Sequence, residues 1–122
     1  MDVADRIEAA LGGVLPVYGQ TPEFGSDEPK RYAIYIITER GAEYAEGEDG
    51  ATEYLCRLSV FTPRLDYALY RRIKAAMRAA GFGYAAGGQT GTDGLFPYVT
   101  HYYLDFLGVE CNAEWRAFRL RA

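Results

Sequence analysis

The chain has 122 residues, of which 49% are hydrophobic and 25% charged, and this composition predicts one soluble globular domain that folds without a metal ion or a disulfide framework. A net charge of −4 at pH 7 argues against nonspecific nucleic-acid binding, which requires a basic surface. The two cysteines are isolated and no apolar run approaches the ~20 residues of a membrane helix, so the sequence predicts neither a disulfide scaffold nor a transmembrane protein.

The first predicted element is an amphipathic helix over Val3–Leu11. Asp2 is suited to cap its first turn, and Gly12 with Gly13 is expected to end it in a left-handed conformation. The charged start of the chain differs from a secretory signal peptide, so we expect a reducing, cytoplasmic setting. A short extended piece over 14–18 and a loop over 20–30 follow. The apolar positions at helical spacing are Val3, Ile7, Ala10, Leu11 and Val14.

The next predicted element is a strand over Tyr32–Thr38 that is apolar on both faces. A strand of this kind is covered on both sides, either by its own chain or by a partner. Because the sequence predicts only two good helices, cover by a partner is an open alternative, and we assign Tyr35 and Ile37 to a candidate interface. One face carries Tyr32, Ile34 and Ile36, and the other carries Ala33, Tyr35 and Ile37.

The connection that follows, over 39–53, is long and acidic, with six carboxylates and three glycines against the single cation of Arg40. Connections of this length are commonly functional. The carboxylates lack the spacing of a calcium-binding loop, so no metal site is predicted. We interpret the segment as a protruding acidic loop between the first two main strands. Four of its residues join the candidate interface, namely Glu43, Glu46, Glu48 and Asp49.

A second strand over 52–61 and a helix that begins at Thr62 are predicted next. The helix has Thr62 as its cap and Pro63 in its first turn, and it stops at Gly81. Its polar side is basic, which allows anion binding, but charged solvated helix faces are common and we favour that interpretation. The apolar face of the strand comprises Tyr54, Cys56, Leu58 and Val60. The buried stripe of the helix comprises Leu65, Leu69, Ile73, Ala76, Met77 and Ala80, and its polar side comprises Arg64, Arg71, Arg72, Lys74 and Arg78.

The last third of the chain is predicted to hold a short strand over 82–85, a glycine-rich loop over 86–97 and the longest strand over 98–107. The glycine-rich run lacks the Lys-Ser/Thr pair of a phosphate-binding P-loop. We interpret 1–109 as a single α+β domain and 110–122 as a C-terminal extension.

The extension is basic from position 115 onward and contains no carboxylate there. It is suited to meet the acidic loop, within one chain or between copies, although two unrelated solvated surfaces are the alternative. Trp115, Arg116 and Arg119 therefore join the candidate interface.

No catalytic site is predicted. His101 is the only histidine, and Asp105 points the same way along the strand but about 13 Å away. Nothing in the sequence supports a pair of His101 with Cys56 or Cys111. We therefore expect no enzymatic activity, no catalytic residue, no cofactor and no bound metal ion. Two alternatives stay open: a small-molecule-binding or regulatory domain, which requires a deep apolar cavity, and an enzyme that uses His101, which requires a cleft and a perturbed titration there.

The chain resembles the tail terminator, or tail-completion, proteins of long-tailed phages and prophages. The resemblance rests on several blocks in the same order, covering most of Met1–Val109, and the chain departs from the pattern beyond Gly108. The blocks are the amino-terminal helix, the run Arg31–Ile36 with Glu39, the loop Ala42–Gly47, the strand Tyr54–Thr62, the helix start Asp66-Tyr67, the helix end Ala79–Phe82, the turn Thr92–Phe96 and the strand His101–Phe106.

The resemblance implies a structural protein that caps the tail tube and joins it to the head by assembling as a ring, commonly a hexamer. Its partners would be further copies of itself, the tail tube and head-completion proteins, with DNA only passing through the lumen and no membrane involved. It would be located in the virion tail after assembly in the bacterial host cytoplasm, without enzymatic activity or cofactor. An acidic lumen lining repels phosphate, so we expect the 39–53 loop to face the lumen or a neighbouring ring.

These inferences predict an α+β fold of defined layout. Two main helices pack on one face of a mixed, mainly antiparallel sheet of four to five strands. The long acidic loop joins the first two main strands.

Overall fold

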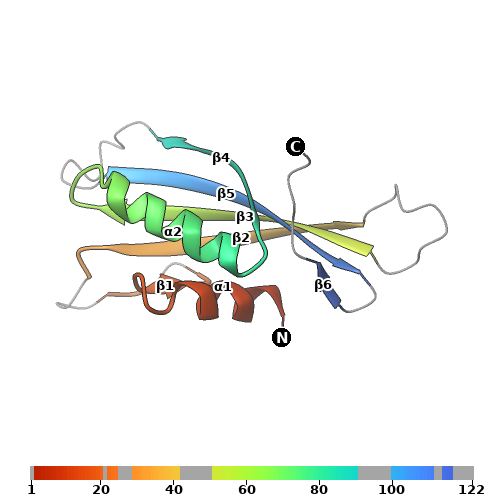
Figure 1. Cartoon of the computed structure of the whole chain (residues 1–122). Helices are drawn as coiled ribbons and strands as arrows, with labels where there is room; N and C mark the ends of the chain where they lie inside the picture. Colours follow the sequence, from red (N-terminus) through yellow and green to blue (C-terminus); the bar gives the residue numbers. More distant parts are fainter. Residues whose placement is uncertain are drawn as a thin grey trace.

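The computed structural model describes residues 2–20, 22–24, 29–41, 51–90, 100–111 and 114–116. Within these residues the fold is α+β, as predicted, with two helices and one mixed sheet (Figure 1). The sheet has six strands, where four to five were predicted, because short β6 pairs with β5 beside the five strands of the main path. The helices are α1 (Val3–Leu11) and α2 (Tyr67–Ala79). The strands are β1 (Val17–Tyr18), β2 (Tyr32–Gly41), β3 (Ala51–Thr62), β4 (Gly83–Gln89), β5 (Thr100–Cys111) and β6 (Glu114–Arg116).

The strands lie in the order β1-β2-β3-β5-β4, and β6 pairs with β5. β1 runs parallel to β2, whereas all other pairs are antiparallel. The register aligns Tyr32 with Phe61 and Phe61 with His101. Residues that lie directly opposite each other on neighbouring strands point to the same face, so these three rings lie on one face of the sheet.

The core lies between that sheet and the two helices, on the opposite face. Both helices lie on the same side of the sheet in Figure 1, and their buried side chains belong to one cluster with those of the central strands. The predicted apolar face of β3 is confirmed, because Cys56, Leu58 and Val60 are fully buried. Leu104 and Phe106 of β5 complete this layer.

Helix α1 is confirmed, with the predicted cap and a different ending. The Asp2 carboxylate accepts a hydrogen bond from the Asp5 backbone N–H at 2.8 Å. Val3, Ile7 and Leu11 are buried, as their spacing predicts. Gly12 has φ −57°, so the predicted left-handed cap is wrong. The chain instead stays right-handed there, and the Leu11 carbonyl accepts from Val14 and Leu15 as the chain turns toward β1.

Helix α2 begins later than predicted. Thr62 is the last residue of β3, where it pairs with Thr100, and its hydroxyl donates to the Arg64 carbonyl at 2.6 Å. Asp66 caps the helix instead, by accepting from the Leu69 backbone N–H at 3.1 Å. The predicted buried stripe holds at Leu69, Ile73 and Met77, and Tyr70 is an additional buried residue that the prediction missed.

The end of α2 follows from Gly81, as predicted. Gly81 has φ 91°, a left-handed conformation that favours glycine. Its N–H donates to the Arg78 carbonyl and that of Phe82 donates to the Met77 carbonyl, which together form a Schellman motif. This turn reverses the chain and sends it into β4.

Two elements near the C-terminus differ from the prediction. β4 continues to Gln89, so the loop predicted from Ala86 begins too early by four residues; pairing with β5, through a bulge after Tyr84, extends the strand. β5 continues to Cys111 and β6 pairs back onto it, so the structure places 110, 111 and 114–116, which we had assigned to an extension, in the sheet.

Candidate interaction surfaces

No helix covers the other face of the sheet in the described part of the chain, although at one end the Phe24 ring packs on Tyr32, with centroids 4.9 Å apart. At one end Phe61 stacks between Tyr32 and His101, with ring centroids 5.1 and 4.7 Å apart. At the other end Leu55 is 38% exposed, beside a hollow of about 180 Å³. Ile36, between them, is 59% exposed. We call this surface the bare face; its apolar and aromatic members are Tyr32, Ile34, Ile36, Leu55, Phe61, His101, Tyr103 and Leu107.

An ion pair lies in the middle of the bare face. Arg57 donates from Nε to Asp105 Oδ1 at 2.8 Å and from Nη2 to Oδ2 at 3.0 Å, which is the bidentate geometry. Asp105 is only 8% exposed, whereas about half of the Arg57 side chain reaches solvent and lies 4.8 Å over the Tyr103 ring. The hydrogen bonds to Asp105 raise the pKa of Arg57 above its ordinary value. The face is therefore apolar with one fixed polar centre.

His101 contributes a ring to this face and shows no acid–base partner among the described residues. Asp105 is engaged by Arg57, and Cys56 lies on the opposite face of the sheet. Burial, and then the charge of Arg57, lower the pKa of His101. Its Nε2 is buried and makes no hydrogen bond to the described part of the chain. The perturbed titration that the enzyme alternative requires is present, but no nucleophile or paired acid accompanies it there.

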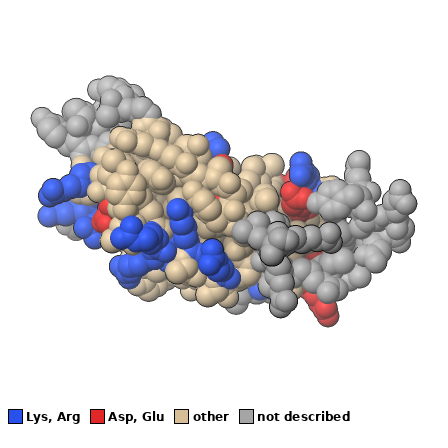
Figure 2. Space-filling view, turned by 45° about the horizontal axis from the view of Figure 1, so that its top comes forward, with Lys and Arg blue, Asp and Glu red and all other residues tan. Residues whose placement is uncertain are grey.

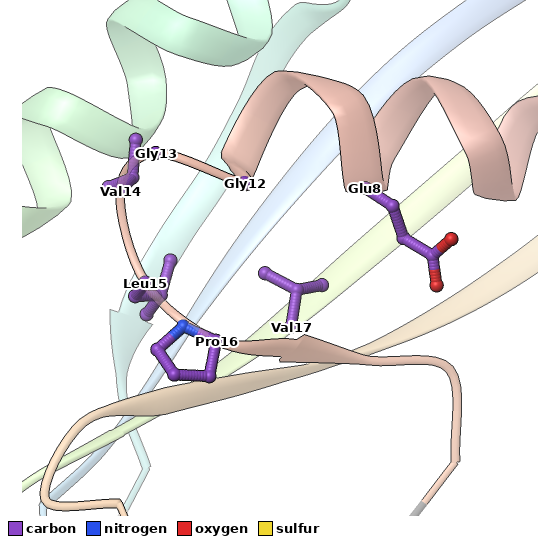
Figure 3. A pocket seen from close by; sticks show the side chains of 7 residues that line it. All are labelled: Glu8, Gly12, Gly13, Val14, Leu15, Pro16 and Val17. Atoms are coloured by element: carbon purple, nitrogen blue, oxygen red, sulfur yellow. The ribbon is translucent and has the colours of Figure 1, made fainter.

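A hollow of about 470 Å³ lies at the C-terminal end of α1 (Figure 3). It is open to solvent and lined by Glu8 and by the turn over 12–17. The Glu8 carboxylate accepts a hydrogen bond from the Tyr35 hydroxyl at 3.0 Å. Burial and this bond raise the pKa of Tyr35 to about 12. A shallow groove whose carboxylate is already engaged lacks the convergent polar groups of a small-molecule site.

The outward side of α2 forms a basic surface. Residues 62–90 contain five cations and one carboxylate, Asp66, which caps the helix and lies 3.3 Å from Arg31. Figure 2 shows Lys and Arg side chains gathered over the part of the molecule where α2 lies. Arg71, Arg72 and Arg78 are exposed. We call these three residues, together with the exposed Ala68 and Ala75 on the same side of the helix, the basic face.

A second charged surface lies beyond the C-terminal end of α2, on the same side of the sheet. Glu39 and Glu110 flank Tyr54, whose pKa is raised by burial and by these two carboxylates. Trp115 of β6 stacks on Tyr54, with centroids 6.1 Å apart and planes 23° apart. We call Glu39 and Glu110 the acidic end.

Of the predicted interface residues, the structure describes the side chains of Tyr35, Ile37 and Trp115. Tyr35 is 8% exposed and Ile37 packs partly buried against the core, because both residues face the helix side of the sheet. Trp115 is partly buried by Tyr54 and by Phe82, whose ring is 4.8 Å away. The side chain of Arg116 lies outside the described residues, as do Glu43, Glu46, Glu48, Asp49 and Arg119 entirely.

The residues most exposed on the bare face, Ile36 and Leu55, were not among the predicted interface residues. The alternation of β2 showed two apolar faces but did not indicate which one the helices cover. That choice depends on tertiary packing, since both faces have similar hydrophobicity in the sequence.

Among the described residues, no group of three or more His, Cys, Asp or Glu side chains is placed to hold a metal ion. No helix there is both long and apolar enough to cross a membrane.

Comparison with protein-family models gives no match, and comparison with curated proteins gives none either.

Proposed function

We propose that the chain is a structural protein of a phage or prophage tail that caps the tail tube and joins it to the head by assembling as a ring. The observation that carries this proposal is the bare face, where large apolar side chains remain exposed although the opposite face holds a complete core. The resemblance of the sequence blocks to tail terminator proteins supplies the specific role.

The bare face has the composition of a contact surface. Exposed apolar patches rimmed by polar groups mark protein interfaces more often than catalytic sites. A standard interface covers about 800 Å² per partner, which is about a tenth of the 8101 Å² surface of the chain. Each Å² of apolar surface removed from water contributes about 25 cal/mol, so covering this face supplies a driving force for assembly.

The charges support a closed, head-to-tail assembly. A ring requires two different complementary surfaces on every subunit. The basic face and the acidic end are two such surfaces, and they lie on different parts of the chain. In the proposed ring the acidic connection between β2 and β3 faces the lumen or a neighbouring ring, where its charge repels passing DNA.

The test is deletion of the coding sequence from the phage or prophage genome that carries it, followed by electron microscopy of the particles. We expect tails that lack heads or have abnormal length, a large loss of infectious particles, and restoration by the wild-type chain supplied in trans. Normal, infectious virions after deletion would overturn the proposal.

The acidic connection has its own test in the same assay. Neutralisation of Glu43, Glu46, Glu48 and Asp49 to the matching amides is expected to impair particle assembly or DNA release, because the repulsion of phosphate is lost. The free energy of unfolding of the isolated chain, measured by urea titration, is expected to stay unchanged. Full infectivity of this variant would count against the placement of the loop.

A further inference from the structure

We propose that the basic face of α2 in one copy docks on the acidic end of the next copy, so that the polar part of the ring contact is Arg71, Arg72 and Arg78 against Glu39 and Glu110. This inference deepens the proposed ring assembly and rests on it. It assigns the contact between neighbouring subunits to two surfaces of this chain.

The basic face is shaped for close approach. Along the outward side of α2, exposed Ala68 and Ala75 alternate with Arg71, Arg72 and Arg78 at the spacing of helical turns. The small side chains let a partner come near the helix, and the guanidinium groups then reach its carboxylates. No ion pair joins these arginines to a carboxylate within the described part of the chain.

The acidic end offers the matching chemistry. Its carboxylates flank the stacked rings of Tyr54 and Trp115, and both rings keep part of their surface exposed. A guanidinium of a neighbouring copy can pair with these carboxylates. The Trp115 ring itself is already engaged within the chain, by Tyr54 and by Arg6, whose guanidinium carbon lies 4.8 Å from the ring centre.

A second copy suits the basic face better than a nucleic acid does. The chain as a whole carries a net charge of −4, which repels a polyanion, whereas a second copy presents carboxylates at one defined place. The two surfaces differ from each other, so the contact is head-to-tail and propagates from copy to copy. Such a contact produces a ring when the rotation between copies closes.

The test uses sedimentation velocity on the full chain and two charge-reversed variants. Arg71→Glu with Arg78→Glu is expected to weaken self-association on the order of tenfold or more at low salt, and Glu39→Arg with Glu110→Arg is expected to do the same. An equal mixture of the two variants is expected to recover association, since each mutated surface then meets its complement. Raising the salt from about 50 mM to about 1 M NaCl should weaken the wild-type contact.

The matched control is Lys30→Glu with Arg64→Glu, which changes the net charge equally away from the basic face and should leave association unchanged. Circular dichroism checks that every variant folds. A wild-type chain that stays monomeric at low salt, or a mixture that does not recover association, would overturn the contact. Binding of duplex DNA that is lost in the Arg71→Glu, Arg78→Glu variant without a change in association would assign the surface to nucleic acid and also overturn it.

Failure of the proposed contact can be distinguished from failure of the proposed tail function. If deletion abolishes normal particles but the Arg71→Glu, Arg78→Glu chain restores them fully, the contact is wrong and the tail function stands. If deletion leaves particles normal while the charge-swapped mixture associates, the contact stands and the tail function is wrong.

Discussion

The packing of Trp115 from β6 against the core depends on Gly108 of β5. A Cβ atom at this position would collide with the indole of Trp115, and the Phe82 ring also lies close by. Trp115 covers Phe82 and Tyr54 only because β5 offers a bare backbone beneath the indole. The glycine thus serves close packing, since its φ lies outside the left-handed region that glycine alone favours.

Gly108→Ala is therefore expected to lower the free energy of unfolding by about 1–3 kcal/mol, because the indole must move to admit the methyl group. Urea unfolding followed by Trp115 fluorescence measures the change. Gly13→Ala is the control, since a Cβ atom there meets nothing within 4 Å. Equal stability of the two variants would mean that Trp115 does not pack as described.

The buried thiol of Cys56 is expected to make the fold less stable at alkaline pH. The thiol is fully buried, and burial raises its pKa from 9.0 to about 12. The folded chain therefore keeps a proton that the unfolded chain releases above pH 9, so this contribution to stability is complete below pH 9 and is lost as the pH rises toward 12.

Between about pH 9 and pH 11 the free energy of unfolding is expected to fall by on the order of 2 kcal/mol from this group alone. Cys56→Val removes the titrating group at similar volume and should flatten that part of the curve. Urea titrations of both chains across the range provide the measurement. If the free energy of unfolding of the two chains changes in parallel with pH, the pKa of Cys56 is not raised in the folded state.

At the scale of single elements, the start of α2 shows how tertiary pairing selects between two similar sequence signals. Thr62-Pro63 and Asp66-Tyr67 both have the composition of a helix start. Pairing of Thr62 with Thr100 extends β3 and excludes the first, so Asp66 becomes the cap.

Asp66→Ala is expected to cost about 1 kcal/mol of stability, because the Leu69 N–H loses its capping carboxylate. Asp5→Ala is the comparison, since its carboxylate lies in the first turn of α1 and does not cap it. Thermal unfolding by circular dichroism compares the two. A larger loss of stability from Asp5→Ala than from Asp66→Ala would contradict the capping role of Asp66.

The sequence predicted those elements whose signal is local. The alternation in β3 and the stripe on α2 have strong periods, and their buried faces followed directly. The missed elements depend on distant residues: β4 extends past Ala86 because β5 pairs with it, and β6 has three residues that gain stability only by pairing and by the packing of Trp115. The basic side of α2 was visible in the sequence, whereas the acidic end was not, because only the fold brings Glu39 and Glu110 together beside Tyr54.

At the scale of the whole molecule, the two sides of the sheet have different tasks. The helix side holds the core and both charged surfaces, whereas the bare face holds exposed apolar groups around one ion pair. Substitutions on the bare face can therefore perturb assembly without disturbing the core.

Ile36→Glu places a charge on the bare face and is expected to leave the free energy of unfolding within about 0.5 kcal/mol, because the side chain is already 59% exposed. In trans complementation of the deletion it should nevertheless fail to restore infectious particles. Ala9→Glu, on the exposed side of α1, is the control and should restore infectious particles. Restoration of particles by Ile36→Glu would show that the bare face contacts no partner.

The Arg57–Asp105 pair determines which surfaces the bare face accepts. Any molecule that covers this face strips water from a nearly buried carboxylate and from a half-exposed guanidinium. A purely apolar partner surface makes no hydrogen bond to the pair, so its binding costs several kcal/mol of the pair's hydration energy. A partner with a hydrogen-bonding group opposite Arg57 avoids this cost. The pair therefore disfavours nonspecific aggregation and fixes the orientation of a bound partner.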